Sequence, residues 1–114
     1  MVVAAFVPGR GDLIWLTFDP QAGHEQAGRR PALVLSPRAY NQRSGLALVC
    51  PITSHVKGYP FEVLVEEPCG IAGAILADQI RNVDWKARRA ERIGSLSAAA
   101  WDEVLGRVAP LLGL

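Results

Sequence analysis

The sequence predicts a small, mainly β domain that closes as a barrel and ends in one α-helix. Gly and Pro recur at short intervals through the first three quarters of its 114 residues. The segments between them are short and rich in β-branched and aromatic residues, which is typical of strands joined by tight turns. Only the last segment has a helical period. We expect one domain over residues 1–114, because a chain of this length supports a single core.

Each expected strand is a short apolar run that a turn signal closes. Asp19-Pro20 ends the first run and Pro37 ends the second, after which residues 38–44 predict a helical turn. In the fourth run, Phe61, Val63 and Val65 share one face because side chains alternate along a strand. The expected strands cover residues 13–18, 31–36, 46–53, 61–65, 73–80 and 90–93.

The C-terminal segment predicts the helix that closes the barrel. Ser97 is a suitable N-cap, and four apolar residues after it recur at i, i+3, i+4 and i+7, the spacing of one helical face. Pro110 lacks an amide donor and its ring clashes with the preceding turn, so we expect the helix to kink or end near Ala109. The expected buried face consists of Trp101, Val104, Leu105 and Val108.

Composition excludes several classes of protein. The net charge of +1 argues against a basic tail of the histone type and against an acidic disordered tail. Lys57 and Lys86 are the only lysines among twelve basic residues, and Arg forms the paired hydrogen bonds with phosphate that Lys cannot. Residues 1–7 lack a basic start and are too short for a membrane span. We therefore expect a soluble, cytoplasmic protein.

Metal and nucleophilic catalysis are both disfavoured. His24, His55, Cys50 and Cys69 show none of the spacings that hold a metal ion. No serine-nucleophile motif occurs, and Cys50 lies in an apolar run. We expect both cysteines to behave as small apolar residues, and we expect no metal and no cofactor.

One polar loop, residues 23–31, carries an unusual set of functional groups. It supplies an imidazole from His24, a carboxylate from Glu25, and two guanidinium groups from Arg29 and Arg30. Arg30 directly precedes the second expected strand, which would hold it rigidly. The alternative is an ordinary solvated surface loop.

Further polar residues lie at the ends of two apolar strands. Thr53 ends the third expected strand, and Asp78, Gln79 and Arg81 lie at the end of the fifth. Strand ends converge at the mouth of a small barrel, so these groups can meet the polar loop in space. Ordinary capping and turn formation are the alternative for Thr53 and Asp78.

A base, a cation and hydrogen-bond donors suit one reaction in particular. Cleavage of RNA by its own 2′-hydroxyl requires a proton acceptor, groups that stabilise charge on the phosphate, and a proton donor to the departing 5′-oxygen. No cofactor takes part in that reaction, and Arg is well suited to the phosphate oxygens.

The same residues carry a family resemblance, because the chain closely resembles the MazF branch of the MazF/PemK/Kid family of toxin endoribonucleases. The matching stretches cover almost all of the chain up to Trp85, and the helix after it matches by pattern only. The stretches are Gly11-Asp12-Leu13-Ile14-Trp15, Phe18-Asp19-Pro20, Glu25-Gln26-Ala27-Gly28, Arg30-Pro31, Leu35-Ser36-Pro37, Tyr40-Asn41, Lys57-Gly58-Tyr59-Pro60-Phe61-Glu62-Val63 and Ala77-Asp78-Gln79.

The resemblance implies a fold and an activity. The fold is the SH3-like β-barrel with a C-terminal helix of the CcdB/PemK-like toxins, and it acts as a homodimer. The activity is sequence-specific, ribosome-independent and metal-independent cleavage of single-stranded mRNA, which leaves a 2′,3′-cyclic phosphate and a 5′-hydroxyl and inhibits translation. A MazE-like antitoxin is the implied partner.

The resemblance also implies roles for individual residues. The family's catalytic Arg falls on Arg30, as acid or charge stabiliser, and its catalytic Thr falls on Thr53, which would hold the phosphate. Kid-type members pair an Asp, here Asp78, with an Arg two residues earlier, where this chain has a leucine. The base therefore stays open among Glu25, His24 and Asp78, with Glu25 preferred.

Single-stranded RNA is bound by aromatic and guanidinium faces together with cations. We expect five basic residues to lie in or beside the barrel mouth: Arg29, Arg30, Lys57, Arg81 and Lys86. For Phe61 and Trp85 a core position is favoured over RNA contact, and Trp15 is expected in the core. The candidate RNA-contact residues are Arg29, Lys57, Tyr59, Phe61, Gln79, Arg81 and Lys86.

Two alternatives use the same fold. A CcdB-like gyrase poison would act through the end of its last helix, although this chain ends Leu112-Gly113-Leu114 where that family carries an aromatic-Gly-Ile tail. A catalytically inactive RNA-binding barrel would bind RNA without cutting it. The recognised RNA sequence depends on the conformation of the loop from Ser54 to Pro60.

Overall fold

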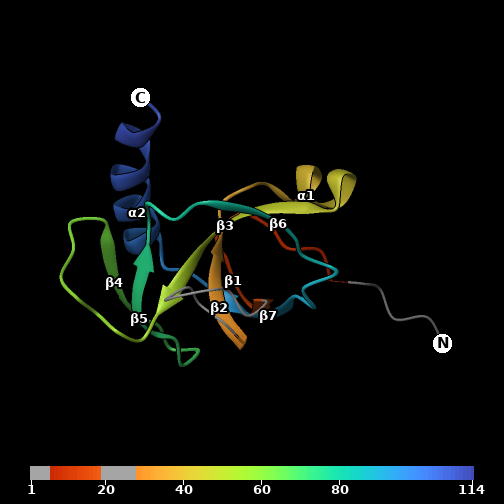
Figure 1. The fold of residues 1–114 in the computed structure, drawn as a ribbon, viewed down its shortest axis with the longest axis horizontal. Helices are drawn as coiled ribbons and strands as arrows, with labels where there is room; N and C mark the ends of the chain where they lie inside the picture. Colours follow the sequence, from red (N-terminus) through yellow and green to blue (C-terminus); the bar gives the residue numbers. More distant parts are fainter. Residues whose placement is uncertain (1–5, 19–27) are drawn as a thin grey trace.

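The computed structural model describes residues 6–18 and 28–114, and Figure 1 shows them as a curled β-sheet with two helices. Mainly β structure with a C-terminal helix was the predicted class, and it is confirmed. The elements are β1 Asp12–Phe18, β2 Gly28–Val34, α1 Arg38–Ser44, β3 Leu46–Thr53, β4 Glu62–Glu66, β5 Ala72–Leu76, β6 Arg81–Asp84, β7 Glu91–Ser95 and α2 Ala98–Leu111.

The long strand β3 organises the sheet. The strand order is β4-β5-β3-β2-β1-β7, with β6 also paired to β3, and every one of these pairs is antiparallel. Residues Leu46–Val49 of β3 pair with β6, whereas Ile52 and Thr53 pair with β5. The sheet therefore curls around β3, with α2 beside β4 and β5 at one end and α1 at the other (Figure 1).

Alternating side chains of β1, β2 and β3 build an apolar cluster on each face of the sheet. Leu13, Leu33 and Cys50 share the face on which Val104 and Val108 of α2 pack. Ile14, Leu16, Ala32 and Val49 belong to the cluster on the other face, together with Val83 and Trp85. The central strands therefore carry a packed apolar cluster on each face.

Two strand boundaries differ from the prediction. β2 begins at Gly28, three residues before Pro31, so Arg29 and Arg30 belong to the strand instead of the loop. The expected strand over 73–80 ends at Leu76, where the chain turns and the amide of Gln79 donates to the Leu76 carbonyl at 3.0 Å; a further strand, β6, begins at Arg81. β6 then pairs with the opposite end of β3, a change of partner that apolar character alone does not signal.

The C-terminal helix agrees with the prediction at its start. Ser97 is the N-cap, and its side chain accepts a hydrogen bond from the Ala100 amide. A kink or an end was expected near Ala109; Pro110 lies inside the last turn, and the helix ends at Leu111, two residues later. Val104 and Val108 are buried, but Leu105 is 42% exposed, so the buried face is narrower than predicted.

Two other predictions about burial are wrong. Trp15 was expected in the core but is 37% exposed, because the cluster under α2 includes Leu13 on the same face but does not extend along β1 to Trp15. Cys69 was expected to behave as an apolar residue but is exposed in the turn that follows β4. Trp85 is buried as favoured, and Trp101 packs against the core.

Candidate functional site

An open hollow of about 290 Å³ lies at the end of the sheet where β2 begins and β3 ends. Four stretches of chain meet there: the middle of β1, the start of β2, the end of β3, and the connection from β4 into β5. The lining residues are Trp15, Arg29, Arg30, Pro31, Ile52, Thr53, Ser54, Gly70, Ile71 and Ala72. The hollow therefore combines two guanidinium groups, two hydroxyls and an indole.

Strand register brings Arg30 and Thr53 to the same place. The last aligned pair of β2 and β3 is Ala32 with Pro51. Two residues further, toward the start of β2 and the end of β3, lie Arg30 and Thr53. Because side chains repeat every two residues, Arg30 and Thr53 share a face of the sheet. The meeting of these two groups, expected from the sequence, is a consequence of this register.

The hydroxyl of Thr53 is buried and oriented. Thr53 is 5% exposed, and its Oγ1 accepts a hydrogen bond from the His55 amide at 3.1 Å. A hydroxyl that accepts from an amide still has its own proton to donate. Thr53 can therefore donate to an anionic oxygen in the hollow without giving up its backbone contact.

Gly73 allows the close approach of β5 to the end of β3. A Cβ at this position would lie 2.2 Å from the carbonyl oxygen of Thr53, and the φ of +144° is one that side chains rarely allow. Only glycine therefore permits the Thr53–Ala74 pairing in this form. The glycine holds the backbone of Thr53 in place at the edge of the hollow.

Arg29 has a different role from Arg30, although the two are adjacent. Its Nη2 donates to Glu91 Oε1 at 2.7 Å and to the Arg89 carbonyl at 2.5 Å, and its Nη1 donates to Thr17 Oγ1 at 2.9 Å. These contacts join β2 to the start of β7. The geometry favours a structural role for this side chain over the RNA contact expected for it.

The loop over residues 54–60 leaves β3 directly after Thr53. Ser54 borders the hollow, and every residue of the loop is exposed. Lys57 Nζ lies 5.8 Å from the centre of the Tyr59 ring, which is itself 60% exposed. Phe61, the other aromatic residue expected here, is half-buried. A cation and an aromatic face therefore lie on the chain that leads out of the hollow.

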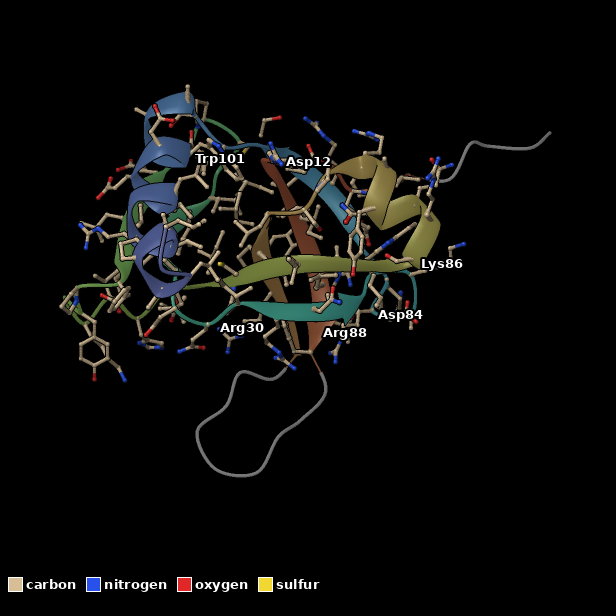
Figure 2. All side chains as sticks on the ribbon, turned by 90° about the horizontal axis from the view of Figure 1, so that it is seen from above. Asp12, Arg30, Asp84, Lys86, Arg88 and Trp101 are labelled. Atoms are coloured by element: carbon tan, nitrogen blue, oxygen red, sulfur yellow. The ribbon has the colours of Figure 1, made fainter. Side chains whose placement is uncertain are left out.

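The remaining basic candidates lie in two places. Arg81 is half-buried beside Phe18, with 5.3 Å between its guanidinium carbon and the ring centre, and Arg88 lies on the same ring at 5.8 Å. Figure 2 places Lys86 at the end of the molecule that carries α1, away from Arg30. The expected gathering of basic residues at one mouth is therefore incomplete, because neither Arg81 nor Lys86 lines the hollow.

The other candidate residues are less close to the hollow. Asp78 and Gln79 are exposed in the turn between β5 and β6 and do not line it. His24 and Glu25 lie outside the described residues. Within residues 6–18 and 28–114, no three His, Cys, Asp or Glu side chains gather as a possible metal site. In the same part of the chain, neither helix has the length and apolar character needed to traverse a bilayer.

The buried thiol is unsuited to nucleophilic chemistry, as the sequence indicated. Burial, and to a smaller extent the charge of Asp78, raises the pKa of Cys50 to about 12. The thiol is therefore protonated near neutral pH, whereas the thiolate is the nucleophile.

Sequence reasoning missed two groups of the hollow. Trp15 and Ile71 line it, but Trp15 was assigned to the core and Ile71 was assigned no role. The position of Trp15 could have indicated its place in the hollow. Trp15 pairs with Pro31, next to Arg30, so it lies at the same end of the sheet as Arg30.

Comparisons with known proteins identify the family. Residues 9–112 match the model of the PemK-like, MazF-like toxins of type II toxin-antitoxin systems. The chain is 44% identical over 114 residues to the endoribonuclease toxin MazF of Escherichia coli K12, an alignment that covers 98% of this chain and all of that protein.

Solved structures of MazF proteins have the same fold as this chain. A crystal structure of MazF from Deinococcus radiodurans superimposes with a TM-score of 0.88 at 54% identity, covering 96% of this chain and 100% of that one. A MazE-MazF crystal structure from the same organism gives a TM-score of 0.87 at 54% identity, covering 96% and 99%. The chain therefore belongs to the PemK-like, MazF-like family of toxins of type II toxin-antitoxin systems.

Proposed function

We propose that this protein is a sequence-specific, ribosome-independent endoribonuclease toxin that cleaves single-stranded mRNA without a metal ion and so inhibits translation. The observation that carries the proposal is the meeting of Arg30 and Thr53 in one hollow, in a chain whose relatives are named endoribonucleases.

The proposed reaction uses the substrate's own 2′-hydroxyl. A base takes the proton of this hydroxyl, the 2′-oxygen forms a bond to phosphorus, and the bond from phosphorus to the 5′-oxygen breaks as that oxygen gains a proton. Arg30 stabilises the charge that grows on the phosphate oxygens or supplies the proton, and Thr53 holds a phosphate oxygen by its hydroxyl. The products carry a 2′,3′-cyclic phosphate and a 5′-hydroxyl.

We propose that one of three residues, Glu25, His24 or Asp78, acts as the base. We favour Glu25, and the position of Asp78 outside the lining of the hollow supports that choice. RNA contacts are assigned to the exposed Lys57 and Tyr59 and to Arg81, while Phe61 and Gln79 stay secondary candidates.

The biological setting follows from the relatives. A protein named MazF is seen with MazE in solved complexes, so we propose that a MazE-like antitoxin binds and neutralises this chain. We propose that it acts as a homodimer in the cytoplasm, where mRNA is found.

The test is cleavage of a long natural mRNA in excess EDTA, with mapping of the cut sites and analysis of the new ends. We expect cuts at one short sequence with cyclic phosphate ends. Arg30→Ala should lower the cleavage rate by about 10³-fold, and Arg30→Lys, which keeps the charge but loses the planar fork, should recover only part of it. Intact RNA across several sequences, or full activity of Arg30→Ala in the folded state, contradicts the proposal.

The two alternative functions are separated by further outcomes. A gyrase poison would lose its effect when residues 112–114 are removed, whereas a ribonuclease should keep its activity. A non-catalytic RNA-binding barrel would retain an oligonucleotide on a filter without shortening it.

A further inference from the structure

A buried carboxylate lies beneath the loop over residues 54–60. Glu62 begins β4 and is only 8% exposed. Its Oε1 accepts hydrogen bonds from the amides of Lys57, Gly58 and Tyr59, at 3.0, 2.7 and 3.2 Å. Its Oε2 lies 3.2 Å from the Lys57 amide. A buried carboxylate requires such donors, and here consecutive amides of one loop supply them.

The backbone of the loop is shaped around this carboxylate. Consecutive amides that point inward form a concave anion site, and the left-handed φ of +79° at Gly58 is one that glycine adopts without strain. The Tyr59 carbonyl closes the turn by accepting from the Glu62 amide at 3.0 Å. At the far end of the loop, Arg107 of α2 donates to the Pro60 carbonyl. The loop is therefore held both from beneath and from the helix.

This arrangement determines which groups of the loop face a ligand. The amides of residues 57–59 already bind a carboxylate of the protein, so they are not a site for a substrate phosphate. The side chains of Lys57 and Tyr59 are exposed instead, one beside the other. An exposed aromatic ring next to a cation is the arrangement that binds an unstacked base and its phosphate.

We propose that Glu62 is a positioning residue that holds Lys57 and Tyr59 as a preformed platform for a nucleotide of the bound RNA. The inference rests on the proposed function, because it takes single-stranded RNA as the ligand. The loop that carries the platform begins directly after Thr53, which lines the hollow, so one RNA strand can contact both. Glu62 itself does not touch the substrate.

The main test combines Glu62→Ala with Tyr59→Ala. If Glu62 acts through the platform, each single substitution lowers kcat/KM by about 10-fold or more, mostly through KM, because one misplaced contact has an effect of that order. In the Glu62→Ala background, Tyr59→Ala then adds less than about 2-fold, since the ring is no longer in position. Glu62→Gln retains one acceptor oxygen and should recover activity to within about 3-fold.

Controls separate this role from general stability. Val65→Ala, on the same strand and 7% exposed in the native chain, should lower the melting temperature but keep kcat/KM below that temperature. Glu66→Ala removes an exposed carboxylate from the end of β4 and should change neither the melting temperature nor kcat/KM. If Glu62→Ala does not fold, Gly58→Ala distorts the same loop without emptying the space beneath it and should show the same loss and the same lack of additivity with Tyr59→Ala.

Binding measurements separate this inference from the proposed function. In the Arg30→Ala background, Glu62→Ala should weaken the binding of a fluorescent single-stranded RNA by about 10-fold. If the wild-type chain does not cleave but binds RNA in a manner that depends on Glu62, the proposed function fails and the inference stands. Additive effects of Glu62 and Tyr59, or binding that Glu62→Ala leaves unchanged, overturn the inference.

Discussion

Two exposed connections of this protein look alike in sequence and differ in how they are held. The loop over residues 54–60 and the turn over residues 85–90 each contain a lysine over an aromatic ring, Lys57 at 5.8 Å from Tyr59 and Lys86 at 5.7 Å from Trp85. In the loop the ring is 60% exposed, whereas in the turn it is 6% exposed.

The tethers differ in the same way. The amides of the loop bind a buried carboxylate. The turn has a buried anchor only at its start, where Trp85 Nε1 donates to the Asn41 carbonyl at 2.9 Å. Its later residues are tied by exposed groups: Asp84 accepts from the Ala87 amide at 2.9 Å, and Arg29 donates to the Arg89 carbonyl. Buried tethers give a precise backbone position because water cannot replace them, whereas exposed tethers compete with water. The difference supports the proposal that the loop presents its side chains to RNA, while the turn connects β6 to β7.

The largest effect is expected from the left-handed residue of each connection. Gly58→Ala places a Cβ at a φ of +79° and should destabilise the protein by about 1–2 kcal/mol. Arg89 has a φ of +57° without being glycine, so Arg89→Gly relieves strain of about 1–2 kcal/mol but adds about 0.5–1 kcal/mol of chain entropy in the unfolded state. We expect a net gain of about 0.5 kcal/mol, measured by urea unfolding. Changes in the free energy of unfolding of equal size and opposite sign for the two substitutions would contradict the expected difference between the loop and the turn.

The lysines provide the next largest contrast. Lys57→Ala should lower kcat/KM for a cleavable RNA by about 5-fold, or about 1 kcal/mol, because a cation beside the proposed platform is lost. Lys86→Ala should lower it by less than about 2-fold, because Lys86 lies at the end that carries α1. Similar losses of kcat/KM in both variants would show that Lys86 also contributes to RNA binding. That result would contradict the distinction between the loop and the turn.

The fold was largely predictable because its signals are local. Turn residues bounded most strands, and the Ser97 cap with its helical period located the start of α2. The division of residues 73–80 between a strand and a turn was missed, because apolar residues lie on both sides of Asp78 and Gln79 while the pairing partner of the chain changes there. Sheet pairing is a property of distant segments, and local pattern carries little of it.

The part of the site where strand ends converge was predictable from the sequence. Residues whose burial differs from the polar–apolar alternation along their strand were harder to predict. Arg30 and Thr53 meet as expected. Glu62 lies between the apolar positions of β4, which predicts an exposed side chain, yet the loop over residues 54–60 covers it. Trp15 shows the opposite case, an apolar residue that extends past the core cluster into the hollow. In both cases the burial is decided by a segment from elsewhere in the chain.

The smallest predicted effect concerns the exposed tether of the turn. Arg29 and Glu91 form an ion pair at 2.7 Å, with side-chain exposures of 31% and 68%. A double-mutant cycle of Arg29→Ala and Glu91→Ala should give a coupling energy of about 0.5 kcal/mol or less, because exposed ion pairs are solvated and screened. Since that coupling is electrostatic, 1 M salt should remove most of it, whereas the hydrogen bonds from Arg29 to the Arg89 carbonyl and Thr17 should remain in the Glu91→Ala single variant. A salt-insensitive coupling energy well above 1 kcal/mol would show that the turn is held as firmly as the loop. The rigidity of the loop could then not explain why the platform is proposed for the loop and not for the turn.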